Sequence, residues 1–138
     1  MEVNGLLRFG RLPPEQKLLL LEAAKTLGLA SLINSVLPFR NAIRFGAIEI
    51  STKSDTDIGE CVWAVEAASL RLPLRTKCIE KGIALQRMLR RRGVDARLRY
   101  GARIAGNEVE AHVWVTVRGF PVMGGAEASG FSEVASFP

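Results

Sequence analysis

The stretch RLRYGARIAGNEVEAHVWVTVRGFPVM, residues 97–123, decides the fold of this chain. From Val94 onward, apolar and polar residues alternate with a period of two, which is typical of half-buried β-strands. Gly106-Asn107 supplies one turn and Arg118-Gly119 a second. We therefore expect an antiparallel meander whose second strand is 109–117 and whose third is 120–123.

Three helices are expected ahead of this meander. Residues 13–36 begin with two prolines suited to a first turn and carry leucines at helical spacing. A second helix is expected over 58–70, and a third begins after Thr76, continues to Arg92 and ends at Gly93. Helices followed by antiparallel strands predict the α+β class, with the N-terminal helices and the third helix packed on the meander.

The chain has 138 residues, of which 48% are hydrophobic and 24% charged, with a net charge of +5. This length predicts a single domain, 1–138, in which 1–57 forms a mainly helical N-terminal part. The basic balance favours acidic partners. No signal peptide is evident, and Glu22 and Lys25 interrupt the apolar stretch from Leu18 to Leu37. We expect a soluble cytoplasmic protein with reduced thiols, without peripheral membrane contact.

Cys78 and His112 are the residues that could carry chemistry. Cys78 is expected in the first turn of its helix, where unpaired backbone N–H groups and the helix dipole favour a thiolate. It heads an inward face that continues through Gly82, Leu85 and Leu89. His112 is the only histidine. If the fold brings the two side chains together, they form a nucleophile and its base.

The expected strand 109–117 has one face of valines with Ala111, and another that carries Glu110, His112, Trp114 and Thr116. For His112 to meet Cys78, we expect this mixed face to look toward the start of the Cys78 helix. The N-terminal helices would then cover the valine face. Cys61 has no histidine of its own and is expected in the core, whereas Trp114 could shield the imidazole from water.

Three segments carry a resemblance to a known family: 74–79 (LRTKCI), 85–94 (LQRMLRRRGV), and 111–115 (AHVWV) with Gly119. They resemble the transglutaminase-like cysteine peptidases of lasso-peptide biosynthesis, over about half of the chain. Residues 36–40 also resemble the N-terminal helical region of such proteins. The resemblance implies a papain-like or transglutaminase-like core over 58–138. It further implies a stand-alone leader peptidase, with Cys78 as nucleophile and His112 as base.

The same resemblance implies as partners a precursor peptide, a leader-peptide-binding protein and a lasso cyclase, and it implies no metal or bound organic cofactor. Family members place an aspartate about twelve residues after the histidine, a position that Gly124 occupies here. Glu127 is our candidate for the third catalytic residue. Glu110 and a backbone carbonyl are alternatives. A catalytically impaired homologue that only binds the precursor therefore remains a competing interpretation.

Arginines cluster in two places, at the end of the third helix (90–92) and on the first strand and its turn (97, 99 and 103). The first cluster is expected as a solvated helix end, where cations are favoured by the dipole. Together the clusters could form a basic strip for an acidic leader peptide or its binding protein. A basic nucleic-acid-binding module is the least favoured alternative, because no recognition motif is present and we expect no nucleic-acid partner.

Overall fold

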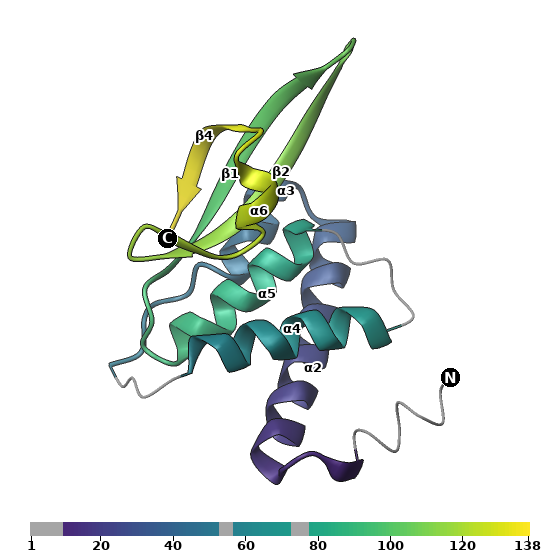
Figure 1. Cartoon of the computed structure of the whole chain (residues 1–138), viewed down its shortest axis with the longest axis vertical. Helices are drawn as coiled ribbons and strands as arrows, with labels where there is room; N and C mark the ends of the chain where they lie inside the picture. Colours follow the sequence, from purple (N-terminus) through teal and green to yellow (C-terminus); the bar gives the residue numbers. More distant parts are fainter. Residues whose placement is uncertain (1–9, 53–56, 73–77) are drawn as a thin grey trace.

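The fold is a four-stranded antiparallel sheet backed by helices. It is seen in a computed structural model that describes residues 10–52, 57–72 and 78–138, without the side chain of Glu127. Strand order in the sheet is β3-β2-β1-β4. The hairpin of β1 and β2 projects beyond the helices (Figure 1). In chain order the elements are α2 (Pro14–Val36), α3 (Phe39–Ala42), the 3-10 helix η1 (Ile43–Phe45), α4 (Ile58–Arg71), α5 (Cys78–Arg91), β1 (Ala96–Ala105), β2 (Glu108–Val117), β3 (Phe120–Met123), α6 (Gly125–Ala128) and β4 (Ser132–Phe137).

The three expected helices are confirmed as α2, α4 and α5. Helix α2 runs through Gly28 without a break. Helix α4 begins after Asp57, whose Oδ1 accepts a hydrogen bond from the Glu60 amide at 3.2 Å, an N-cap that opens the helix. Helix α5 is followed by Gly93 at φ 84°, a left-handed conformation suited to a helix C-terminus. The expected cap Thr76 lies outside the described residues.

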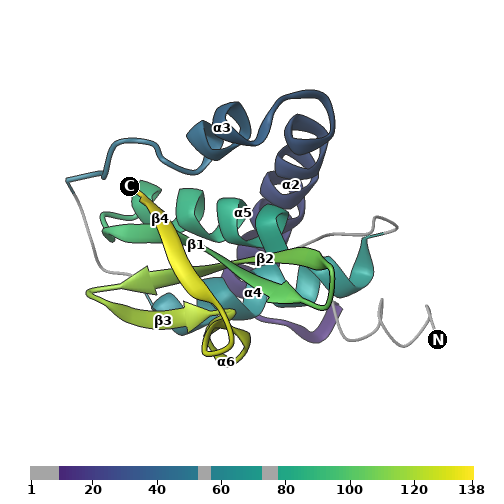
Figure 2. The same ribbon diagram turned by 90° about the horizontal axis from the view of Figure 1, so that it is seen from above.

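The expected meander is confirmed, and the α+β class with it, but the sheet also contains an unexpected fourth strand. Arg118 and Gly119 have φ angles of 53° and 83°, the paired positive values of a tight hairpin turn between β2 and β3. Strand β4 pairs antiparallel with β1 and places Phe137 opposite Leu98. Strand β4 lies next to β1 at the edge of the sheet away from β3, and in Figure 2 it runs from beside α6 to the C-terminus.

The predicted orientation of the sheet is wrong, because α5 covers the valine face of β2. A Cβ atom on Gly82 would lie 2.8 Å from Leu98 Cδ1 and 3.4 Å from Val113 Cγ2, so helix and sheet approach closely at this glycine. The apolar faces of both elements must be removed from water, and α5 supplies the matching surface. The mixed face is covered instead by the chain after β3, where Trp114 is buried.

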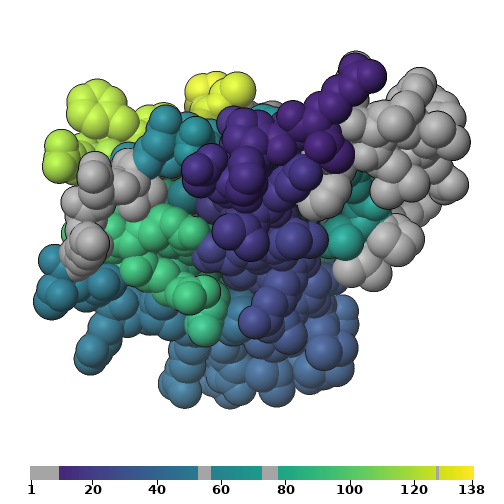
Figure 3. Space-filling view, turned by 90° about the horizontal axis from the view of Figure 1, so that it is seen from below, coloured from purple at the N-terminus to yellow at the C-terminus, as the bar shows by residue number. Residues whose placement is uncertain are grey.

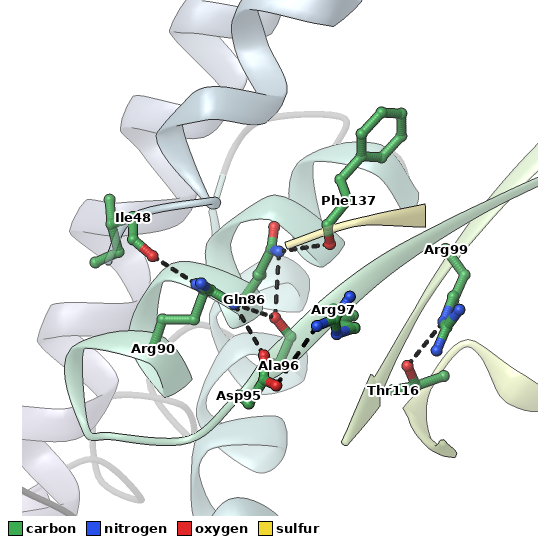
Figure 4. A network of polar contacts seen from close by, with 9 residues as sticks. All are labelled: Ile48, Gln86, Arg90, Asp95, Ala96, Arg97, Arg99, Thr116 and Phe137. Carbon is green, nitrogen blue, oxygen red and sulfur yellow. Dashed lines mark hydrogen bonds and ion pairs between the residues drawn. The ribbon is translucent and has the colours of Figure 1, made fainter. Parts of the chain in front are cut away.

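Two buried polar side chains of α5 connect this helix to three other segments (Figure 4). Gln86 Nε2 donates to the carbonyl oxygens of Ala96, at 3.3 Å, and Phe137, at 3.2 Å. Arg90 donates to the carbonyl oxygens of Ile48 and Ala96 and to the Asp95 carboxylate. Arg90 is therefore a structural residue of the interior, which corrects the expectation of a solvated helix end.

The other expected members of the basic strip also have partners within the chain. Arg91 and Arg92 pair with Glu22 of α2, and Arg97 pairs with Asp95. Arg99 and Arg103 pair with Glu133 and Glu110, respectively. These carboxylates balance much of the charge on which a basic strip would depend.

Helix α2 lies across the face of the molecule seen in Figure 3. Among the described residues, α2 is the one helix that is long and apolar enough to cross a membrane, judged by length and composition only, although Glu22 and Lys25 interrupt it. Its inner side chains Ala23, Leu27 and Ala30 are nonetheless buried in the core. Leu18, Leu21 and Leu32 remain exposed on its outer side.

Candidate active site

Cys78 and His112 lie on the wall of one cavity of about 310 Å³. Cys78 is the first residue of α5, and His112 lies near the middle of β2. Strand β3 pairs with β2 only as far as Val115, so His112 lies beyond the paired part of this edge. The full lining consists of Glu66, Cys78, Lys81, His112, Val113, Met123 and Gly124. The fold thus brings together two residues separated by a helix and a hairpin.

The imidazole of His112 is oriented by a main-chain carbonyl. Its Nε2 lies 2.9 Å from the carbonyl oxygen of Gly124. A carbonyl oxygen only accepts hydrogen bonds, so this contact requires the proton on Nε2. In the neutral ring Nδ1 then carries the lone pair and is the nitrogen that can accept a proton.

The backbone of Gly124 has a conformation that few other residues adopt. Its φ angle is 77°, in the left-handed region. A Cβ atom here would lie 3.1 Å from the Val113 carbonyl oxygen and 3.4 Å from His112 Nε2. The glycine therefore lets the chain pass close to the imidazole and present its carbonyl oxygen there. This contact is made at the position where the resemblance to the leader peptidases implies an aspartate.

The structure describes the side chain of only one of the two glutamates considered as third catalytic residue. Glu110 is exposed and pairs with Arg103, its Oε2 accepting from Nη2 at 2.7 Å and from Nε at 2.9 Å. Its carboxylate is thus engaged on the neighbouring strand. The backbone of Glu127 lies in α6, but its side chain is outside the described part of the structure. A role for Glu127 stays a prediction.

Aromatic rings enclose the imidazole. The ring of Trp114 is stacked with it at a centroid distance of 6.0 Å, and Phe131 lies at 5.3 Å in a tilted arrangement. His112 itself is half-buried. The rings restrict the orientation of the imidazole and its access to water. Phe131 was missed in the sequence, since it lies just before β4 and 19 positions after His112 along the chain.

An ion pair forms part of the cavity wall beside Cys78. Lys81 Nζ lies 3.2 Å from Glu66 Oε1 and 3.3 Å from Oε2, joining α5 to α4. The sequence contains a signal for Lys81, because a residue three positions after Cys78 lies on the same side of a helix. Glu66 carries no such signal, because it reaches the cavity from another helix.

The two cysteines have different surroundings. Cys61 is buried in the core as expected, and burial raises the pKa of its thiol above the ordinary value, so its reactive thiolate form is disfavoured. Cys78 is half-buried and lies on the cavity wall. Of the two thiols, only that of Cys78 lies on the cavity that contains the imidazole.

Comparison with known proteins gives the family of the chain. Residues 23–136 match the family model of the Transglutaminase-like superfamily, a span that includes most of α2 and reaches into β4. No curated protein and no solved structure matches the chain. This superfamily includes cysteine peptidases. Since the match covers far more than half of the sequence, the chain belongs to the transglutaminase-like superfamily.

Proposed function

We propose that this chain is a cysteine peptidase that removes the leader from a ribosomally synthesised lasso-peptide precursor before macrolactam closure. The observation that carries the proposal is the cavity shared by Cys78 and His112, with His112 held by the Gly124 carbonyl. Superfamily membership supports the cysteine chemistry. The resemblance of 74–79, 85–94 and 111–115 to the leader peptidases supports the substrate.

In the proposed reaction His112 Nδ1 takes the proton of the Cys78 thiol, and the sulfur attacks the scissile carbonyl carbon. A C–S bond forms while the carbonyl oxygen takes up negative charge, which backbone N–H groups at the start of α5 would stabilise. The imidazolium then protonates the leaving nitrogen as the C–N bond breaks. Water, deprotonated by His112, attacks the thioester, releasing the leader acid and restoring the thiol.

The Gly124 contact supports an active enzyme over an impaired homologue. In a catalytic triad the third residue accepts a hydrogen bond from the histidine, sets its tautomer and stabilises the imidazolium. The Gly124 carbonyl can perform the first two tasks but carries no full charge to perform the third. We therefore propose a cytoplasmic peptidase that is slower than a carboxylate-containing relative, acting with a leader-binding protein and a cyclase.

The direct test is cleavage of a candidate precursor by the full chain, with and without a leader-binding partner, with the products weighed by mass spectrometry. We expect cleavage at one bond, and its loss in Cys78→Ala and in His112→Ala. Cys61→Ala is the matched control and should retain cleavage. Iodoacetamide should modify Cys78 before Cys61 in the folded protein, because the Cys61 thiol is buried and its pKa is raised.

Two other outcomes would favour the alternatives. Binding of the precursor without cleavage, under conditions in which Cys78 still reacts with iodoacetamide, would favour a precursor-binding subunit. Salt-dependent binding of random DNA without cleavage of any precursor would favour a nucleic-acid-binding module.

A further inference from the structure

Helix α2 carries an exposed apolar stripe that neither the core nor the candidate active site uses. Its members follow one another every three or four residues, apart from one longer gap that Lys25 fills, so they lie on one side of the helix. They are Leu18, Leu21, Leu29, Leu32 and Val36, each between 40% and 68% exposed. Single exposed leucines are common on protein surfaces, but a stripe of this length indicates a binding face.

A cavity of about 410 Å³ lies beside the middle of this stripe. Leu21 and Leu29 belong to its wall, and Phe45 of η1 adds an aromatic ring. Helix α5 contributes Arg87 and Arg91. Figure 3 shows the face of the molecule on which α2 lies at the surface. The stripe is therefore not flat, because a hollow with apolar walls opens next to its centre.

The charges around this cavity are not balanced. Its lining contains three cations, Lys25, Arg87 and Arg91, and one carboxylate, Glu22. That carboxylate is already bound by Arg92 at 2.8 Å and lies 3.6 Å from Arg91. Among the described residues, no carboxylate forms an ion pair with Lys25 or Arg87. An anionic group of a ligand would therefore meet cations that the chain itself does not neutralise.

The guanidinium of Arg87 is held in place without being neutralised. Its Nη1 donates to the carbonyl oxygen of Phe45 at 2.9 Å, and its Cζ lies 4.2 Å from the centroid of the Phe45 ring. Burial and the nearby Arg91 lower the pKa of Arg87 below its ordinary value, so these surroundings disfavour its charge. A guanidinium has five N–H donors, and those that remain can bind a carboxylate.

We propose that the stripe and its cavity, here called the α2 docking face, bind an acidic amphipathic helix of a partner protein. An apolar side chain of that helix fills the cavity between Leu21, Leu29 and Phe45, and a neighbouring carboxylate pairs with Lys25 and Arg87. Helices that dock through an apolar face use anchors three or four residues apart, which is the spacing of the stripe. This inference does not depend on the peptidase function.

Charge and shape favour this occupant over two others. In a two-fold contact between copies of the chain the same face meets itself, so the cations of one cavity would lie against those of the other. A helix that lies on a membrane carries Lys and Arg along its polar face. Here the three cations gather at one cavity in the middle of the stripe, where a single carboxylate can reach them.

The test measures binding of two synthetic helical peptides by fluorescence anisotropy. Both carry leucines every three or four residues along one side, and they differ only in the residue beside the central leucine, which is Glu or Lys. We expect the wild-type protein to bind the Glu peptide about tenfold or more tightly than the Lys peptide. Lys25→Glu should lose this preference. Arg118→Glu, at an exposed cation on the turn after β2, is the control and should keep it.

A second pair of variants tests the apolar part of the face. Leu21→Ser removes a residue that belongs to both stripe and cavity, and it should weaken binding of the Glu peptide about tenfold. Leu70→Ser is the matched control, because Leu70 is 84% exposed on α4 and lies outside the stripe. Equal binding of both peptides, no binding of either, or unchanged binding in Leu21→Ser would overturn the proposal.

Two further measurements decide between this occupant and the other two. We expect the wild type to sediment as a monomer and to remain unbound when mixed with vesicles of phosphatidylcholine and phosphatidylglycerol. A dimer that Leu21→Ser converts to a monomer would assign the face to a second copy of the chain. Vesicle binding that Leu21→Ser abolishes would assign it to a membrane surface, and either result would overturn the proposal.

Discussion

Gly124 contributes to the candidate site through its main chain. Its carbonyl oxygen holds His112 Nε2, and its positive φ angle and lack of a side chain allow the close approach. An aspartate at this position would orient a histidine through its side chain and add negative charge. In the proposed reaction, the glycine at residue 124 makes a main-chain carbonyl the group that orients the base and leaves the imidazolium less stabilised.

Gly124→Ala should reduce both stability and activity. A β-carbon in the left-handed region costs about 1–2 kcal/mol, and this one would also crowd the Val113 carbonyl oxygen and His112. We expect the carbonyl to move away from Nε2 and kcat/KM of peptide cleavage to fall about tenfold or more. Urea unfolding and initial rates measure the two effects.

Gly119→Ala is the matched control for this change. Gly119 has a φ angle of 83°, and a Cβ atom there would meet nothing within 4 Å. The Gly119→Ala variant should lose a similar free energy of unfolding as Gly124→Ala and keep the kcat/KM of the wild type. Equal activity in both variants would show that the Gly124 carbonyl does not position the base.

At the scale of elements, the pair of Glu22 and Arg92 joins α2 to the end of α5. Arg92 Nη1 lies 2.8 Å from Glu22 Oε2, and Arg91 lies on the other side of the carboxylate. The hydrogen bond from Arg92 lowers the pKa of Glu22 below its usual 4.5, against the opposing effect of burial. The contact attaches the longest helix of the described chain to the helix that bears Cys78.

Glu22→Gln should destabilise the protein at neutral pH by about 1.5–3 kcal/mol, the range for hydrogen bonds to charged groups. Because the folded-state pKa of Glu22 is lowered, its stabilising effect is fully present above about pH 4.5 and is lost as the pH falls through the folded pKa. Urea unfolding of wild type and variant should therefore differ at pH 7 and converge in acid. Glu108→Gln, at an exposed position, is the control, and a difference independent of pH would contradict this account.

For the whole molecule, the buried Gln86 connects helix α5 to the first and the last strand of the sheet in chain order. Its Nε2 contacts the carbonyl oxygen of Ala96, at the start of β1, and that of Phe137, at the end of β4. The side chain is fully buried, and a Cβ atom on Gly46 would lie 2.6 Å from its Oε1. One glutamine therefore fixes α5 against the first and last strands of the sheet.

Gln86→Leu keeps the approximate volume and removes both hydrogen bonds. We expect a loss of about 1–3 kcal/mol from the two carbonyl oxygens that it leaves without this donor. In Gln86→Leu, hydrogen exchange of the backbone amides of β4 should speed up relative to the wild type, and by more than exchange in β1 and β2. Mass spectrometry measures this change. Gln16→Leu, on the half-buried side of α2, is the control. Unchanged exchange in β4 would show that strand pairing alone holds this edge.

Local order was predictable in this chain because it depends on neighbours in sequence. The bounds of α2, α4 and α5 and the turns at 106–107 and 118–119 follow from caps, glycines and periodicity. The contribution of Phe131 and the partners of Arg90 were not predictable, because they depend on segments far apart in the chain. Strand β4 was missed for the same reason: a short edge strand is recognised by the strand it pairs with.

By itself, the sequence determined the α+β class, the order of helices and strands, and Cys78 and His112 as the pair to examine. Only the tertiary structure decided which face of β2 receives α5, that both residues line one cavity, and that Gly124 supplies the hydrogen-bond acceptor for the imidazole. Helices and turns are stabilised by hydrogen bonds between residues a few positions apart. The covered face and the site depend on packing between distant elements, since both faces of β2 contain apolar residues that must be buried.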